Sequence, residues 1–442
     1  MNELISYLKS NKENELYPAD IAKILRGLNE EDFTNAIKII PKSIIGDIAL
    51  ELPDRYFDDI INSLDVEDLI YAVKELESDD QVEFMQELQE VDRDKASKVF
   101  KSLDKENQQE ITMLQSYNED EAGSFMQTEL FTAKIDEVVQ NSIERFSQLK
   151  KSNKIENVHT IFIIDNRDRL LYCIDLDDIL TFDFSITFKE NIKDNAENFE
   201  PIKAYDTEDI KNVVNYFKEY DLSVIPIVNR ENVLLGRITS DDIYDIINEH
   251  ATEQMYNLAG VNDDAEEDEE VLKAGKTRAT WLSINLVTAI LASIVIGLFQ
   301  ETIDSMVALA VLMPIVASMG GNAGTQTLTV VVRQLALGDI SHSEAARIIK
   351  KEVSISLLNG ILFAIIMGAI ASIWFGKGML GVVIALSMVI NLFMAGFFGA
   401  TIPLLLKKMG IDPAIGSTVI LTTVTDVVGF FSFLGLATMI LL

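Results

Sequence analysis

Two polar motifs lie inside long apolar stretches in the C-terminal part of the chain. Asp426 ends the sequence Thr-Thr-Val-Thr-Asp at 422–426, and residues 319–326 read Met-Gly-Gly-Asn-Ala-Gly-Thr-Gln. An ionised carboxylate in hydrocarbon costs several kcal/mol, so it normally faces water, a partner or an ion. Backbone that leaves a membrane helix must be buried in protein or line a polar cavity. The acid and the expected helix break together predict a path for a cation.

A single carboxylate favours a hydrated divalent ion. Mg²⁺ dehydrates reluctantly and is typically held by one or two carboxylates while it keeps several waters. If two chains shared a pore on a two-fold axis, their Asp426 side chains would form a facing pair. A lone aspartate could instead relay protons, and this alternative stays open. The candidate residues of the ion path are Asp426, Asn322, Gly320, Gly321, Gly324, Gln326, Thr422 and Thr425.

Five apolar stretches must position these residues. They are 279–303, 307–335, 354–375, 379–406 and 414–441, and each can cross about 30 Å of hydrocarbon. Pro314 and the pair Gly320-Gly321 fall inside the second stretch, so we expect that helix to bend or open there. Close packing of the small residues against a neighbouring helix is the alternative.

The positive residues predict an orientation in the membrane. They precede the first stretch, separate the second from the third, and separate the fourth from the fifth: Lys273, Lys276, Arg278, Arg333, Arg347, Lys350, Lys351, Lys407 and Lys408. The other two turns contain only Lys377. The positive-inside rule places the N-terminal part in the cytoplasm and the C-terminus outside. We expect an integral protein of the plasma (inner) membrane, and the polar residues 1–15 predict no cleavable signal.

The charge of the chain is concentrated before the apolar stretches. Residues 271–442 contain 10 Lys and Arg against 7 Asp and Glu, whereas residues 1–270 contain 27 against 63. The net charges are therefore +3 and −36, out of −33 for the whole chain. Such an acidic surface repels phosphate, so nucleic acid is not expected as a partner. It attracts divalent cations, which are the expected partners. The single cysteine, Cys173, suits a reducing cytosol.

The acidic part contains two kinds of repeat. An apolar residue recurs every twelve positions at Leu28, Ile40, Leu52, Leu64, Leu76 and Leu88, which predicts stacked amphipathic helices in residues 1–130. Further on, two similar segments, 160–179 and 224–243, each show two β-branched apolar runs followed by a helix opened by Asp. This pattern predicts two strand–strand–helix units within residues 131–249.

The two units resemble a tandem pair of CBS domains. The second copy keeps Gly-x-Ile-Thr-x-x-Asp at 236–242, the motif where adenine nucleotides dock in CBS domains. The resemblance makes ATP a candidate cofactor at Gly236, Thr239 and Asp242. The first copy departs from the motif with Tyr172 and Asp175. A helix start capped by Thr239 or Asp241, with no ligand, is the alternative.

Residues 249–260 suit a helix that ends at Gly260, and the acidic run 263–270 suits a solvated linker. In this order the motifs resemble the MgtE family of magnesium channels over nearly the whole chain. The matching segments are 17–22, Ala122-Gly123 with Met126, the CBS pair, 251–253, 258–260, 320–326, 412–414 and 422–426. The resemblance implies a homodimer with ten membrane helices around one pore. It makes Asp426 the pore aspartate, places Asn322 in the pore-lining turn, and makes 249–260 the plug helix that closes the pore.

The resemblance also implies regulation by cytosolic Mg²⁺. The ion would bridge acidic faces of the N-domain, the CBS domains and the plug helix at Asp209, Asp221, Asp242, Asp245 and Glu253, and so favour the closed state. The chain has His250, Gln254 and Lys211 where relatives tend to have acids. We therefore expect closure at a higher Mg²⁺ concentration than in relatives with those acids.

The sequence thus predicts a multidomain protein. Its parts are an all-α superhelical N-domain (1–130), a tandem α+β CBS pair (131–249), a plug helix and linker (250–275), and a transmembrane pore domain of five helices (276–442). The predicted function is that of a Mg²⁺-selective channel in the lipid bilayer, not an enzyme, closed by cytosolic Mg²⁺. The alternatives are a proton-coupled or broader divalent cation transporter, for Co²⁺ or Mn²⁺, and a membrane-anchored CBS nucleotide sensor that conducts nothing.

Overall fold

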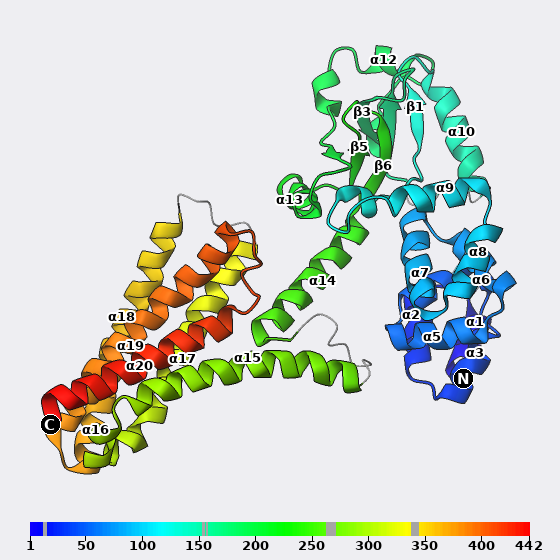
Figure 1. The fold of residues 1–442 in the computed structure, drawn as a ribbon. Coiled ribbons are helices and arrows are strands. Elements are labelled where there is room, and N and C mark those ends of the chain that lie inside the picture. Colours follow the sequence, from blue (N-terminus) through cyan, green and yellow to red (C-terminus); the bar gives the residue numbers. More distant parts are fainter. Residues whose placement is uncertain (12–15, 153–154, 156–157, 262–270, 337–343) are drawn as a thin grey trace. The chain divides into compact units, whose positions relative to one another are not determined.

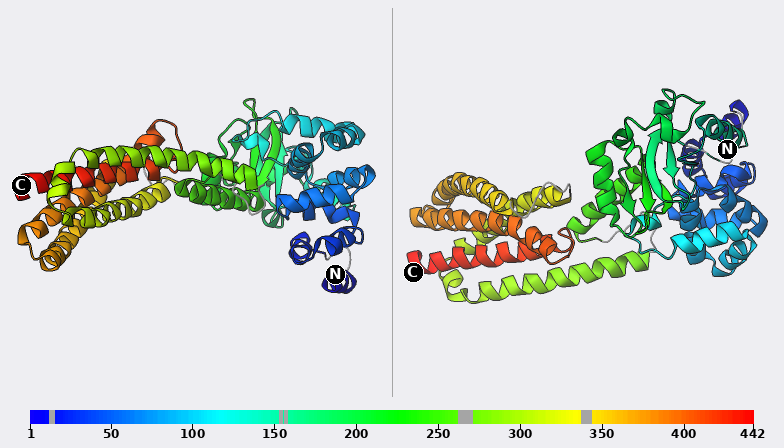
Figure 2. Two further views of the ribbon diagram at one scale, coloured as in Figure 1. Left: turned by 60° about the horizontal axis from the view of Figure 1, so that its bottom comes forward. Right: turned by 90° about the horizontal axis from the view of Figure 1, so that it is seen from above.

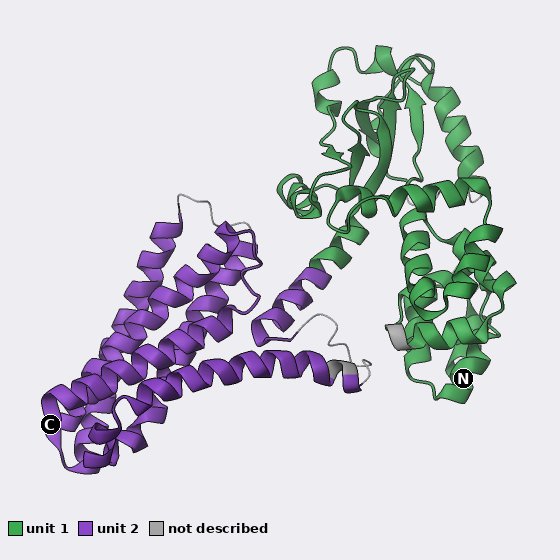
Figure 3. Ribbon diagram, viewed as in Figure 1, with its two compact units in different colours: residues 1–247 green, residues 248–442 purple. Residues whose placement is uncertain are grey.

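The computed structural model describes residues 1–442 except 12–15, 153–154, 156–157, 262–270 and 337–343. The chain divides into two compact units, Met1–Ile247 and Asn248–Leu442 (Figure 3). The predicted acidic linker at 263–270 lies outside the described residues.

The first unit begins with an array of short helices, as predicted. They are α1 (Asn2–Ser10), α2 (Pro18–Arg26), α3 (Glu30–Ile37), α4 (Ile45–Leu50), α5 (Asp54–Ser63), α6 (Val66–Glu75), α7 (Ser78–Val91), α8 (Arg93–Ser102) and α9 (Lys105–Leu114). Asn29, Asp65 and Asp104 cap the starts of α3, α6 and α9 by accepting a backbone N–H. The twelve-residue repeat marks the core, because its members from Ile40 to Leu88 are all buried.

Two three-stranded sheets follow (Figure 1). The first contains β1 (Thr132–Lys134), β2 (Thr160–Ile164) and β3 (Leu170–Asp175), and the second β4 (Ala204–Tyr205), β5 (Val224–Val228) and β6 (Leu234–Thr239). In both sheets the middle strand pairs with the first strand in parallel and with the third strand in antiparallel orientation. The strand–strand–helix units are confirmed, and each gains a short parallel strand that the sequence pattern did not reveal. The helices of this region are α10 (Val139–Lys151), α11 (Leu176–Ile179), α12 (Phe188–Asn191), α13 (Ile210–Tyr220) and α14 (Ser240–Ala259).

Helix α14 runs without interruption from the second sheet to Ala259. Gly260 follows with a φ of 71°, in the left-handed region that glycine adopts easily, so the predicted helix end is confirmed. The boundary between the two compact units, at Ile247 and Asn248, falls inside this one helix.

The second unit contains the apolar helices. They are α15 (Val271–Gly297), the short α16 (Gln300–Ser305), α17 (Ala308–Ala336), α18 (Ala345–Phe375), α19 (Gly378–Lys408) and α20 (Ser417–Leu441). Five of them are long and apolar enough to cross a membrane, as predicted. The third begins at Ala345 rather than 354, because its charged first turns continue the same helix. Helices α17 to α20 lie side by side in every view (Figure 2), with α19 packed against the other three.

Small residues allow α18 and α19 to approach each other closely. A Cβ added to Gly381 would lie 1.9 Å from Ser372 Oγ, and one added to Gly396 would lie 2.2 Å from Ser356 Oγ. No side chain fits at either position, so the two backbones pack at a distance that only glycine permits.

The predicted opening of the second membrane helix is wrong. Helix α17 is α-helical through Pro314 and through the whole glycine-rich segment. Gly320 and Gly324 serve packing instead: an added Cβ would lie 2.3 Å from Asn391 Nδ2 at Gly320, and 3.0 Å from Leu421 Cδ1 at Gly324. Asn391 is fully buried and donates through Nδ2 to the carbonyl of Val316 at 2.8 Å. The small residues thus bring α19 and α20 close to α17, which is the alternative considered from the sequence.

Candidate functional site

Three polar side chains of α17 point away from the bundle. Ser318, Asn322 and Gln326 are exposed and lie four residues apart, on one face of the helix. Asn322 Nδ2 donates to Ser318 Oγ at 3.3 Å. Exposed amides are costly in contact with lipid, so this face is suited to water or to another protein surface.

Asp426 lies at the same depth as this polar face. Helix α20 runs antiparallel to α17, and Leu421 packs against Gly324. Five residues further along α20, this register places Asp426 level with Met319, between Ser318 and Asn322. The Asp426 side chain is half-buried. The structure therefore brings the predicted acid and the predicted amides to one level of the bundle.

The other predicted ion-path residues differ in their surroundings. Gly320, Gly324 and Thr425 are buried in the packing between helices. The hydroxyls of Thr422 and Thr425 donate to backbone carbonyls of α20, those of Thr418 at 2.9 Å and Thr422 at 3.0 Å. A Cβ added to Gly321 would meet nothing within 4 Å. Of this set, Asn322 and Gln326 have the most open side chains.

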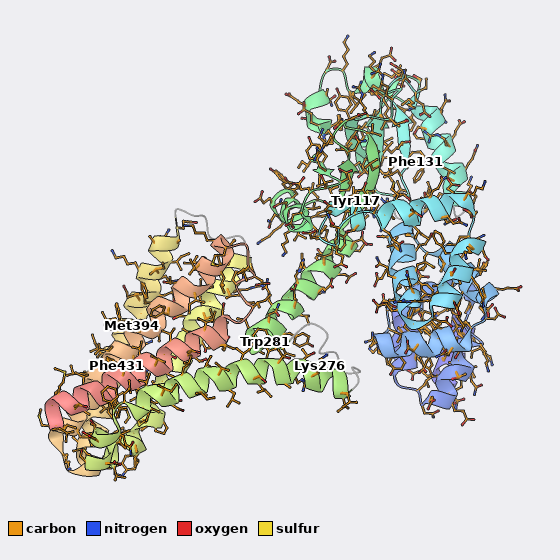
Figure 4. The ribbon with its side chains drawn as sticks, viewed as in Figure 1. Tyr117, Phe131, Lys276, Trp281, Met394 and Phe431 are labelled. Atoms are coloured by element: carbon orange, nitrogen blue, oxygen red, sulfur yellow. The ribbon has the colours of Figure 1, made fainter. Side chains whose placement is uncertain are left out.

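The end of α14 is attached to the membrane helices. Thr418 Oγ1 donates to the carbonyl of Leu258 at 2.8 Å. The Leu258 side chain packs in a cluster with Leu328, Val332, Ile402, Ala414 and Leu421. Trp281 of α15 (Figure 4) lies beside Gly260 and Gly416, whose added Cβ atoms would be 4.0 and 3.6 Å from the indole. The predicted plug segment thus ends against the same ends of α17 and α20 that carry Val332 and Thr418.

Asp242 belongs to a group of acids that sequence analysis did not find. It accepts hydrogen bonds from Thr239 Oγ1 at 2.6 Å and from Gln127 Nε2 at 3.2 Å. Burial raises the pKa of Asp242 above its usual value, and it raises the pKa of Glu77 to about 7 and that of Asp80 to about 8. The pKa of Asp79 is also well above its usual value, again because the carboxyl is buried. The signal in the sequence was the run of acids at the start of α7.

The other predicted regulatory residues are dispersed. Asp209 caps the start of α13 by accepting the N–H of Lys211, and Asp221 ends that helix with a φ of 51°. Asp245 is exposed on α14. Glu253, in the second unit, lies 3.2 Å from His250 Nδ1. Within the described ranges, the group of three carboxylates whose atoms lie within 4.8 Å of one another is Asp175, Asp177 and Asp178, all exposed and none of them predicted.

The motif predicted for a nucleotide makes close contacts within the chain. The backbones of Gln127 and Arg237 exchange two hydrogen bonds, of 2.8 and 2.9 Å. A Cβ on Gly236 would lie 2.6 Å from the carbonyl oxygen of Gln127, and Thr239 bonds to Asp242. Asp242 also accepts the backbone N–H of Thr239 at 3.1 Å, and both adenine nucleotide binding and the capping alternative stay predictions at this motif.

The buried acids predict that the first unit loses stability as the pH rises. In an unfolded chain Asp and Glu ionise near pH 4, so the folded unit keeps protons on Glu77 and Asp80 that the unfolded chain has lost. The free energy of unfolding then falls as the pH rises from about 4.5 to about 8. With a chelator present, we expect calorimetry to give a melting temperature of this unit on the order of 5 °C lower at about pH 8.5 than at about pH 5.5.

Asp80→Asn should flatten this pH dependence, whereas the exposed Asp59→Asn should leave it unchanged. A melting temperature equally sensitive to pH in both variants would show that the buried acids are not its source.

Three domain families match the chain. The MgtE family, described as a divalent cation transporter, matches residues 313–436. The MgtE intracellular N domain matches residues 16–120, and the CBS domain matches residues 197–249.

Similar proteins cover nearly the whole chain. The magnesium transporter MgtE of Bacillus subtilis (strain 168) is 27% identical over 426 residues, which are 96% of this chain and 92% of that protein. The magnesium transporter MgtE of Thermus thermophilus is 26% identical over 433 residues, 97% of this chain and 94% of that protein. A crystal structure of the cytosolic domain of the Mg²⁺ channel MgtE in complex with ATP is 24% identical, covers 53% of this chain and 91% of its own, and has a TM-score of 0.48.

Proposed function

The chain belongs to the MgtE family, whose membrane domain is described as a divalent cation transporter, and from this premise we propose that it is a Mg²⁺-selective channel closed by cytosolic Mg²⁺. The observation that carries the proposal is the polar outward face of α17 at the depth of Asp426. Two such faces around a two-fold axis would line a water-filled path with a pair of carboxylates. A hydrated Mg²⁺ ion could then keep part of its water shell, with amide and water oxygens completing its surroundings.

We propose a homodimer on the strength of the same feature. One chain offers a single Asp426 in this path, and a C2 partner would supply the second. The chain is a membrane protein by its five apolar helices and its family. We place it in the plasma (inner) membrane with the N-terminus in the cytoplasm and the C-terminus outside. An inside-negative potential then drives a divalent cation inward with about 4.6 kcal/mol per 100 mV.

We propose four functional parts: a sensor (1–130), a CBS pair (131–249), a plug helix with its linker (250–275) and a pore domain (276–442). Ionised acids on the cytoplasmic parts repel one another when Mg²⁺ is scarce. Bound Mg²⁺ reduces this repulsion at Asp209, Asp221, Asp242, Asp245 and Glu253 and so favours the arrangement in which α14 closes the path. Relatives are named as transporters, which supports a transport role rather than catalysis. ATP at the second CBS copy is a proposed additional ligand.

The test is Mg²⁺ uptake into proteoliposomes with an imposed inside-negative potential and no proton gradient. Uptake that needs only the potential supports a channel. Uptake that needs a proton gradient would favour a coupled transporter, and faster uptake of Co²⁺ or Mn²⁺ than of Mg²⁺ would contradict the selectivity. No flux of any of these ions would favour the nucleotide sensor.

The plug segment predicts weak sensing of Mg²⁺. Glu253 is paired with His250, and Gln254 offers no charge, so few carboxylates remain there to hold an ion. We expect His250→Glu combined with Gln254→Glu to lower the Mg²⁺ concentration that halves the flux several-fold. Met255→Glu adds an acid at an exposed position of the same helix and should change little. Equal shifts in both proteins would mean that only the added negative charge matters.

A further inference from the structure

The polar outward face of α17 extends further than the predicted ion-path residues. Thr329 and Arg333 are also exposed, and they continue the series Ser318, Asn322 and Gln326 at steps of three or four residues. This spacing keeps all five on one side of the helix. The opposite side is buried and consists mainly of apolar residues, among them Leu312, Val316, Leu328 and Val332.

The outward face of α18 serves as a comparison within the same bundle. From Ile361 to Trp374 its exposed residues are all apolar, as expected where a helix meets lipid. Amides and a guanidinium on such a surface would be costly. The outward face of α17 is therefore suited to an aqueous path, and the whole series from Ser318 to Arg333 would border it.

Arg333 is the one charged member of this series. It lies 11 residues beyond Asn322, or about 16 Å along the helix. Arg333 lies three residues before the end of α17 at Ala336. Leu335, beside it, packs in a cluster with Ile348 and Leu404. A cation that passes Asp426 and Asn322 on its way inward would meet this positive charge last.

We propose that Arg333 makes ion flow directional by placing a positive charge at the cytoplasmic end of the path. The inference rests on the proposed channel function and its two-fold assembly, which would bring two guanidinium groups to that end. Their repulsion acts twice as strongly on a divalent ion as on a monovalent one. The repulsion lowers the Mg²⁺ concentration at the cytoplasmic mouth, so ions enter slowly from the cytoplasm. An ion that has come from outside and passed Arg333 is repelled into the cytoplasm, because the electrostatic potential decreases with distance from the guanidinium.

The test is the single-channel current of the full-length protein in inside-out membrane patches, with equal Mg²⁺ on both sides at a concentration below the one that closes the channel. For the wild type, we expect the inward current to exceed the outward current at least about threefold at equal and opposite voltages. Arg333→Gln should give nearly equal currents, and Arg333→Lys should keep the asymmetry because it keeps the charge. A single-channel readout counts only assembled proteins, so loss of folding cannot imitate the effect.

Lys350→Gln is the matched control, because Lys350 is an exposed cation near the start of α18 and outside the polar series. It should keep the asymmetry. Persistence of the asymmetry in Arg333→Gln, or an equal loss in Lys350→Gln, would overturn the role of Arg333 and leave the channel function intact. Absence of any Mg²⁺ current in the wild type would instead overturn the proposed function.

Discussion

Asp426→Ala is expected to reduce potential-driven Mg²⁺ uptake to the level of empty liposomes. The variant would remove the carboxylate that lies level with Ser318 and Asn322 on the polar face of α17. Without the paired charges, the uncharged side chains of Ser318 and Asn322 do not offset the cost of a divalent cation in the low dielectric of the membrane. The measurement is indicator fluorescence inside proteoliposomes, with an inside-negative potential and no proton gradient.

Two further variants make this result specific. Asp426→Asn keeps the size of the side chain and should be nearly as inactive, because charge rather than shape is required. Asp304→Ala removes an exposed acid within α16, outside the polar face of α17, and should keep the flux. Normal uptake by Asp426→Asn would show that the residue does not act through its charge and would count against the proposed path.

Gly320→Ala is expected to destabilise the membrane unit strongly, whereas Gly321→Ala should not. The new methyl group at Gly320 would overlap the amide of Asn391, 2.3 Å away. That amide cannot easily move, since it is fully buried, bonded to Val316, and packed on its other side against Gly429, whose added Cβ would lie 2.8 Å from Asn391 Nδ2. We expect a loss of about 3 kcal/mol from overpacking and the broken hydrogen bond.

The neighbouring position is the control for helix propensity. Alanine favours a helix interior over glycine by about 1 kcal/mol at both sites, and at Gly321 the added Cβ meets nothing within 4 Å. Thermal unfolding of the purified protein in detergent measures both variants. Asn391→Ala combined with Gly320→Ala should recover part of the lost stability. Equal damage at Gly320 and Gly321 would mean that the glycines are needed for an unusual backbone rather than for packing.

The sequence determined the parts of this protein whose signals are local. Length and apolarity were sufficient for the five membrane helices, because a span needs only enough hydrocarbon contact to cross the bilayer. Runs of β-branched apolar residues, each followed by a second run and a helix opened by Asp, were sufficient for both strand–strand–helix units, since short continuous apolar runs fit buried strands. Gly260 marked the end of α14, because a left-handed residue after a helix is a property of the residue itself.

The tertiary structure decided what depends on partners distant in the chain. The glycine-rich segment could indicate either a helix break or close packing, because glycine permits both, and only Asn391 and Leu421 on other helices distinguish them. Asp242 was predicted with other regulatory acids and in the nucleotide motif, and the sequence did not connect it to the start of α7. In the structure its charge acts on Glu77, Asp79 and Asp80, whose pKa values are raised mainly by burial. A linear pattern records which residues can make a contact, but the packing of helices selects the neighbours that each side chain meets.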